Sequence, residues 1–70
     1  MRRYKIAEQS GRRIKAIRKR NKLSQEEVAA RARIHVSTFG RIERGEINAP
    51  LQTINKIAQA LGVKPKDLLP

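Results

Sequence analysis

The chain has 70 residues, and its 17 Lys and Arg against six Asp and Glu give a formal net charge of +11 at pH 7. This length corresponds to one domain, and the lack of cysteine excludes disulfides, thiolate zinc sites and thiol nucleophiles. Such a charge predicts an anionic partner, nucleic acid before membrane. No apolar run approaches the roughly 20 residues that span a bilayer, and the basic N-terminus lacks the apolar core of a signal peptide, so we expect a cytoplasmic protein.

The charge is concentrated at the start of the chain. Residues 1–22 hold ten basic residues and one acidic residue, whereas the rest is close to balanced. The segment MRRYKIAEQS, residues 1–10, shows no clear apolar face, and Gly11 is expected to interrupt a helix running through it. We therefore expect residues 1–10 to be a flexible basic arm or an extra helical turn, ahead of a folded domain over residues 11–70.

A basic helix is predicted from residue 12 to residue 20. Ile14 and Ile17 recur at helical spacing and can seat this helix on a core, while most other positions are Lys or Arg. A basic amphipathic helix can also lie on a membrane surface. Two isoleucines without Trp, Phe or Leu form a poor membrane face, so no membrane partner is expected.

The next helix is predicted to begin at a capping box. Ser24 can accept a hydrogen bond from the backbone N–H of Glu27, and the Glu27 carboxylate can accept one from the N–H of Ser24. Val28, Ala29 and Ala32 then form a narrow apolar stripe. These residues predict the first helix of a two-helix unit.

A tight turn leads to a second short helix, predicted from Val36 to Arg44. Phe39 and Ile42 face inward at helical spacing, and Gly45 ends the helix because glycine readily takes a positive φ. Two helices of this length cannot bury their apolar stripes against each other alone. The rest of the chain must therefore supply the core.

The outward face of this second helix has few acidic side chains. Val36, Ser37, Gly40, Arg41 and Arg44 share it at positions i, i+1, i+4, i+5 and i+8. The short side chains let the helix approach a surface closely, and the Arg41 guanidinium can form a bidentate pair with guanine O6 and N7 in the DNA major groove. We therefore expect base contacts from Val36, Ser37 and Arg41. The alternative is an ordinary solvated helix face.

Two of these residues have a second interpretation. Gly40 weakens the helix by roughly 0.5–1 kcal/mol relative to Ala, so it reflects either drift or a need for close approach to DNA. Arg41 could instead clamp a phosphate or pair with Glu46. Both alternatives stay open at the level of the sequence.

Phosphate contacts are expected around the same pair of helices. The free N–H groups at a helix N-terminus attract anions, and here they lie beside Gln25. The residues expected to contact phosphates are Gln25, His35, Thr38, Arg44 and, from the basic helix, Lys19. His35 is the only histidine and has no nearby serine–carboxylate or metal-ligand companion, so we expect no enzyme, no metal site and no cofactor.

The C-terminal part of the chain predicts one strong helix. Pro50 can open it, because a missing N–H costs nothing in a first turn. Apolar residues then recur every three or four positions until Gly62: Leu51, Ile54, Ile57, Ala58 and Leu61. A short turn or helix follows over Pro65–Leu69, and no period-two alternation occurs, so no sheet is expected.

Three motifs, in this order and spacing, resemble the helix-turn-helix repressors typified by phage repressor and Cro proteins, the XRE-like family. They are LSQEEVA at 23–29, IERG at 42–45 and IAQALGV at 57–63, and RRIKAIR at 12–18 matches that family's first helix. The resemblance implies an all-α, compact five-helix lambda-repressor-like domain. It also implies a transcriptional regulator that binds double-stranded DNA sequence-specifically, with the recognition helix in the major groove of a palindromic operator.

The resemblance implies two further pairings. Arg18 and Glu43 match family positions that suggest a partly buried ion pair between the first helix and the end of the recognition helix. Family members bind DNA as pairs, so a homodimer is expected, at least on DNA. The apolar residues left for the dimer interface are Ile47, Leu51, Leu68 and Leu69.

The sequence also departs from the family pattern. Arg33 stands where the family commonly has Gly in the interhelical turn, and His35 stands at the usual Ser or Thr cap. A non-glycine residue forced to positive φ costs of order 1 kcal/mol. The likeness to restriction–modification controller proteins is partial, because residues 35–39 only partly match the start of their recognition helix.

Two other functions remain open. One is an antitoxin-type protein that binds a toxin partner as well as its own promoter, since antitoxins share this fold. The other is a non-specific RNA or DNA binder that uses charge alone, which would show no preference over competitor DNA.

Overall fold

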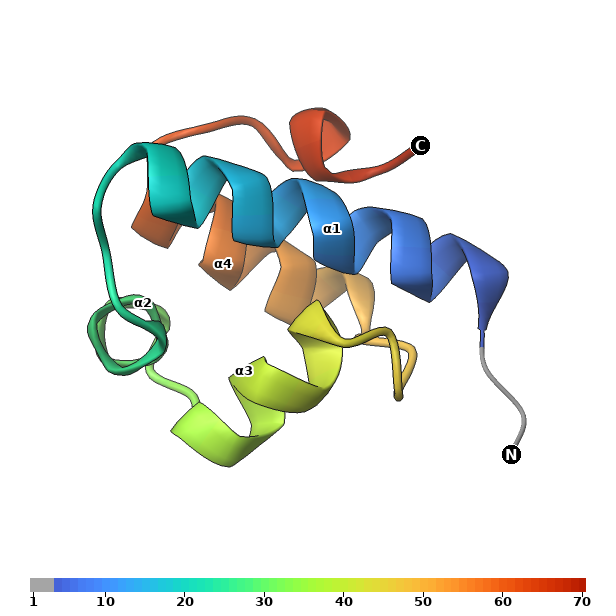
Figure 1. Ribbon diagram of the computed structural model, residues 1–70, viewed down its shortest axis with the longest axis horizontal. Coiled ribbons are helices and arrows are strands. Elements are labelled where there is room, and N and C mark those ends of the chain that lie inside the picture. The colour runs from blue at the N-terminus through green and yellow to red at the C-terminus, as the bar shows by residue number, and fades with distance from the viewer. Residues whose placement is uncertain (1–3) are drawn as a thin grey trace.

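The computed structural model describes residues 4–70, which form four α-helices and one short 3-10 turn (Figure 1). The helices are α1 (Lys5–Arg20), α2 (Gln25–Ala32), α3 (Val36–Glu43) and α4 (Leu51–Leu61), and the turn η1 covers Pro65–Leu68. No strand occurs among these residues, so the prediction of an all-α fold is confirmed. Within the same residues, no helix combines the length and the apolar character needed to cross a membrane.

The expected fifth helix is absent, and that prediction is wrong. The turn η1 has only four residues and i→i+3 hydrogen bonds, from the N–H of Asp67 to the carbonyl of Lys64 and from Leu69 to Lys66. Leu69 precedes Pro70, whose ring disfavours helical geometry in the residue before it. The backbone of Leu69 is accordingly extended, with φ −102° and ψ 144°, so the chain leaves the turn before an α-helix can form.

Gly11 does not interrupt α1, which contradicts the expected helix break. Residues 5–10 extend the helix, and residues 1–3 of the expected arm lie outside the described part of the chain. The glycine has a packing role instead. A Cβ atom built on Gly11 would overlap the carbonyl oxygen of Glu43 and lie 2.6 Å from that of Ile42. Glycine therefore lets α1 lie directly against the C-terminal end of α3.

The core is one cluster to which every element contributes. The helix α1 packs on α3 and η1, and α2 packs on α4 and α3. Figure 1 shows α1 across the molecule, with α4 behind it and α3 on the side away from η1. The largest fully buried side chains are Ile14, Val28, Phe39, Ile57 and Leu68, one from each of the five elements. Burial of each is worth roughly 1.5–3 kcal/mol, so no element is dispensable.

Leu68 was expected at a dimer interface, and this assignment is wrong because the side chain is fully buried in the core. A 3-10 turn rotates successive residues by about 120°, so two adjacent leucines point in different directions. Leu68 enters the core, while Leu69 stays 36% exposed. Only the second leucine is available to a partner.

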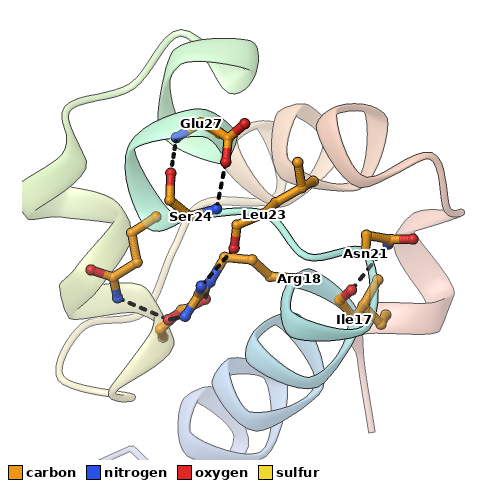
Figure 2. A network of polar contacts seen from close by, with 8 residues as sticks. Ile17, Arg18, Asn21, Leu23, Ser24 and Glu27 are labelled. Atoms are coloured by element: carbon orange, nitrogen blue, oxygen red, sulfur yellow. Dashed lines mark hydrogen bonds and ion pairs between the residues drawn. The ribbon is translucent and has the colours of Figure 1, made fainter.

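The helix α2 begins at the expected capping box (Figure 2). The Ser24 hydroxyl accepts a hydrogen bond from the N–H of Glu27 at 3.0 Å, and the Glu27 carboxylate accepts one from the N–H of Ser24 at 2.8 Å. The bond from the Ser24 backbone is the main reason why the pKa of Glu27 lies below its usual value, and the bond with the Ser24 side chain adds to it. The start of α2 is thus fixed by a charged residue.

We expect the Glu27→Gln variant to lose part of the pH dependence of folding. Glutamine can still accept the bond from Ser24 but cannot ionise. Because folding lowers the pKa of Glu27, its charge stabilises the folded protein above the usual value of 4.5, and this stabilisation is lost as the pH falls through the lowered value. Melting temperatures of both proteins between about pH 7 and about pH 3 measure the difference.

A matched control for this experiment is Glu26→Gln. It removes the same charge from the same helical turn without touching a bond to Ser24. This control should keep the parent's loss of stability in acid. Parallel curves for the parent and Glu27→Gln would contradict the prediction.

The turn between α2 and α3 has a strained backbone at Arg33. This residue caps the C-terminus of α2 in the left-handed region, with φ 59° and ψ 45°. Its N–H bonds to the carbonyl of Ala30 at 3.2 Å, which closes the last turn of α2. The replacement of the family's common Gly by Arg33 therefore does not change the turn to a negative φ, and the arginine itself takes the left-handed conformation.

Candidate nucleic-acid interface

The helix α3 lies at the edge of the molecule, with one face on the core and the other open (Figure 1). Phe39 and Ile42 are buried, as their spacing predicted. The three residues expected to contact bases lie on the open side, since Val36 is 42% exposed and Ser37 and Arg41 are exposed. The fold therefore presents them together on the outer face of one helix.

A buried ion pair joins α1 to the C-terminal end of α3. The Nε of Arg18 donates to Oε2 of Glu43 at 2.6 Å, and Nη2 donates to Oε1 at 3.0 Å. Their side chains are only 10% and 2% exposed. The remaining nitrogen, Nη1, donates to the carbonyl of Leu23 at 2.9 Å, which Figure 2 shows beside the start of α2. Hydrogen bonding to Glu43 raises the pKa of Arg18, so the guanidinium stays charged although buried.

Gln25 extends this network to α2. Its side-chain Nε2 donates to Oε1 of Glu43 at 2.9 Å. Gln25, which was expected to contact a phosphate, therefore already uses one side-chain N–H within the protein. This hydrogen bond links the first turn of α2 to the last turn of α3. The backbone N–H groups of Gln25 and Glu26, in the first turn of α2, have no acceptor within the helix. They are the groups at this end that can meet an anion.

Arg44 is engaged by a carboxylate close to the helix end. Its Nε donates to Oε2 of Glu46 at 2.7 Å, and this bond raises the pKa of Arg44. The Arg44 Nη1 lies 3.1 Å from the place where a Cβ of Gly40 would be. Gly40 is buried under this side chain rather than open to DNA, which corrects its expected position on the outer face. The alternative that pairs Arg41 with Glu46 is not seen among the described residues, where the arginine bonded to Glu46 is Arg44.

The other residues expected to contact phosphates lie at the start of α3 and on α1. His35 is the N-cap residue of α3 and is exposed, but its side chain makes no capping hydrogen bond. Thr38 is half-buried on α3, and Lys19 is exposed on α1. No group of three or more His, Asp or Glu residues within the described chain is placed to hold a metal ion.

Two of the apolar residues expected at the dimer interface line one shallow hollow. Ile47 and Leu69 line it together with Ile6, Ala49 and others, over about 80 Å³. Leu51 lies 64% exposed at the start of α4. Sequence reasoning missed Ile6, which is also 64% exposed, because it lies in a segment without a clear apolar face. Its apolar character was the only signal.

Sequence reasoning also missed two hollows lined by cations. One lies between α1 and the end of α3 and is lined by Glu8, Arg12, Lys15, Glu43 and Arg44. The other lies between α2 and α4 and is lined by Arg31, Ala32, Arg33, Lys56 and Gln59. The density of basic residues was visible in the sequence, but their grouping depends on which helices meet.

Comparison with known proteins gives consistent matches along most of the chain. A family model described as helix-turn-helix matches residues 14–68. The chain is similar to the control protein C.BamHI of Bacillus amyloliquefaciens, with 43% identity over 60 residues that cover 84% of this chain and 74% of that protein. It is also similar to the immunity repressor protein of Bacillus phage phi105, with 44% identity over 54 residues, which cover 77% of this chain and 38% of that protein.

A solved structure extends the similarity to three dimensions. The restriction-modification controller protein C.AhdI from Aeromonas hydrophila has a TM-score of 0.86 and 35% identity, covering 89% of this chain and 94% of that one. The family match spans well over half of the chain, and its residues include both helices of the α2–α3 unit. The chain belongs to the helix-turn-helix family of DNA-binding transcriptional regulators.

Proposed function

We propose that this protein binds double-stranded DNA sequence-specifically, with α3 in the major groove, and thereby regulates transcription. The outer face of α3 carries this proposal, because Val36, Ser37 and Arg41 lie exposed together on a helix whose far end is fixed by a buried ion pair. Short side chains allow close approach to base edges, and an arginine fork selects guanine. The net charge of +11 supplies attraction to the phosphate backbone.

Phosphate contacts would orient α3 in the groove. The N-terminal N–H groups of α2, near Gln25, can bind one phosphate. His35 lies at the N-cap of α3 and Thr38 in its N-terminal half, and Lys19 on α1 and Arg44 at the C-cap of α3 would supply the other contacts. Such contacts fix register and carry no sequence information.

We also propose that the protein binds DNA as a two-fold homodimer. One recognition helix covers too few base pairs to select a site in a genome, so two are needed in successive major grooves. A two-fold axis would place the apolar surface around Ile6, Ile47 and Leu69 against the same surface of a second copy, and the exposed Leu51 is available to the same interface. Ile6, Ile47 and Leu69 line the same hollow, which favours one shared apolar contact between the two copies.

A narrower role is supported by two of the matched proteins. C.BamHI is named a control protein, and C.AhdI a restriction-modification controller protein. We propose that this protein likewise controls restriction–modification genes. Its preferred DNA site should then lie upstream of such genes, and a site found only elsewhere in its genome would contradict this role.

Selection of binding sites from random duplex DNA tests the proposed function. The expected product is an inverted repeat whose half-sites are separated by about 34–36 Å, one helical turn. A selection that enriches no sequence would overturn sequence-specific binding. An enriched site without an inverted repeat would overturn the dimer but not the recognition helix.

Arg41→Ala should cost roughly 1–3 kcal/mol of binding free energy on the selected operator and relax the preference at one base pair per half-site. The guanidinium lies on the open side of α3 and has no carboxylate partner among the described residues. Affinities for the operator and a scrambled duplex at two salt concentrations measure the effect.

The matched control for Arg41 is Lys19→Ala, which removes a cation from α1 instead of α3. If Lys19 contacts a phosphate, its loss should weaken operator and scrambled duplex equally and make the salt dependence less steep. An equal loss on both duplexes for Arg41→Ala would move Arg41 to the phosphate-binding class.

A further inference from the structure

Arg31, Arg33 and Lys56 surround a hollow between the C-terminal end of α2 and α4. Together with Ala32 and Gln59 they line about 360 Å³, and no Asp or Glu is among the lining residues. The three cations are exposed, and their side chains form no ion pair with another described residue. We call these three residues the α2–α4 cation cluster.

Glu27 is the carboxylate one helical turn before Arg31, and it does not neutralise this cluster. Its oxygen accepts a hydrogen bond from the backbone of Ser24, at the opposite end of α2. Arg31 acts on it only through charge, as the smallest cause of its lowered pKa. The hollow therefore keeps an excess of positive charge that the protein itself leaves without a partner.

Helix capping explains only part of this arrangement. Basic residues at the end of a helix offset its dipole, which accounts for Arg31. It does not account for Lys56, which lies in the middle of α4. The helix dipole also does not explain why position 33 has a side chain at all. The φ of Arg33 is 59°, a conformation in which glycine would be unstrained. Arg33 shares this strain with Lys22 among the described residues, and its position beside two other unpaired cations points to a role for its side chain.

The position of the cluster relates it to the recognition helix. Arg33 is two residues before His35, the N-cap of α3. Two residues span at most about 7 Å, so the cluster lies beside the N-terminal end of α3. The Arg18–Glu43 pair lies at the opposite, C-terminal end of α3, and Gln25 is bonded to the same glutamate. The cluster is thus separate from the phosphate contacts expected near Gln25 and Arg44.

We propose that the α2–α4 cation cluster binds a backbone phosphate of the DNA beside the half-site that α3 reads. The proposal rests on the proposed function and adds a contact to it. A phosphate suits the cluster because two guanidinium groups offer planar donor pairs and a lysine adds a point charge. The contact would add affinity and register without reading sequence.

Arg33→Gly tests this phosphate contact without disturbing the fold. Glycine relieves the positive φ and removes one charge, so the melting temperature should stay the same or rise. The slope of log K against log salt concentration should become less steep by about 0.9. For a fourfold rise in salt concentration, the variant should therefore lose about 3.5-fold less affinity than the parent. Arg33→Lys should keep the parent slope, and adding Lys56→Gln to Arg33→Gly should flatten it further.

Lys66→Gln is the control, because it removes one charge from η1, across α1 from α3 in Figure 1. Both variants are titrated with the selected operator and with a mixed-sequence duplex of equal length. Equal slopes for Arg33→Gly and Lys66→Gln on both duplexes would overturn the phosphate contact. If the parent protein binds the selected operator no better than the mixed-sequence duplex, the proposed function is refuted. The salt slopes of the variants on the mixed-sequence duplex still show in that case whether the cluster contacts a phosphate.

Discussion

Replacing Glu43 with alanine is expected to lower the free energy of unfolding by about 3–5 kcal/mol, as removal of one partner from a buried ion pair does. Three hydrogen bonds are lost, two from Arg18 and one from Gln25, at 2.6–3.0 Å. The Arg18 guanidinium would stay buried with only the Leu23 carbonyl as a partner. For a chain of 70 residues the whole stability is about 4–10 kcal/mol, so the variant should be near the limit of folding.

Denaturant unfolding of the parent and three variants measures this loss. Beside Glu43→Ala, the variant Arg18→Met removes the buried cation, and the double variant Arg18→Met/Glu43→Leu replaces the pair by apolar side chains of similar size. Such a replacement of a buried pair is often close to neutral. The double variant should therefore recover most of the stability that Glu43→Ala loses. If Glu43→Ala unfolds within about 0.5 kcal/mol of the parent, the pair is not a major source of stability.

The network also links stability to DNA binding. Glu43 is the last residue of α3, Gln25 the first of α2, and Arg18 lies on α1, so one carboxylate fixes three helices. If the α3 end moved, the reading face would tilt in the groove. A variant that folds but lacks this carboxylate should thus lose operator affinity beyond the loss caused by its unfolded fraction.

Local signals in the sequence predicted the parts of the fold that depend on nearby residues. The capping box at Ser24 needs only a glutamate three positions later, and the burial of Phe39 and Ile42 needs only helical spacing. The Arg18–Glu43 pair spans 25 positions and came from the family resemblance, not from the spacing. The periodicity within one helix predicts which of its faces is buried. It does not predict which residues of another helix will contact that face.

The features that sequence reasoning missed depend on which elements meet. Arg33 and Lys56 lie on different elements, and only the packing of α2 on α4 brings them to one hollow. Leu68 and Leu69 are identical in type, and only the 3-10 geometry places the first in the core. Gly11 illustrates the same limit, because glycine in a helical segment signals either a break or a close approach.

We expect Gly11→Ala to be strongly destabilising, although alanine is the better helix former by about 1 kcal/mol. The new Cβ would overlap the backbone of Glu43 and lie 2.6 Å from the carbonyl oxygen of Ile42. Backbone atoms at the end of a packed helix cannot turn aside as a side chain can, so α1 and α3 must separate. Overpacking of this kind typically costs 1–3 kcal/mol, occasionally more, which outweighs the gain in helix propensity.

Gly40→Ala is the matched comparison, because it makes the same chemical change inside α3. There the nearest atom to the new Cβ is Nη1 of Arg44 at 3.1 Å, the far end of a flexible side chain that can shift. Gly40→Ala should therefore leave stability unchanged or raise it by roughly 0.5–1 kcal/mol. Denaturant unfolding of both variants should show a loss of stability for Gly11→Ala and none for Gly40→Ala if Gly11 is required for close packing. A stabilising Gly11→Ala would contradict this prediction, because it would show that α1 can move away from α3 at little cost.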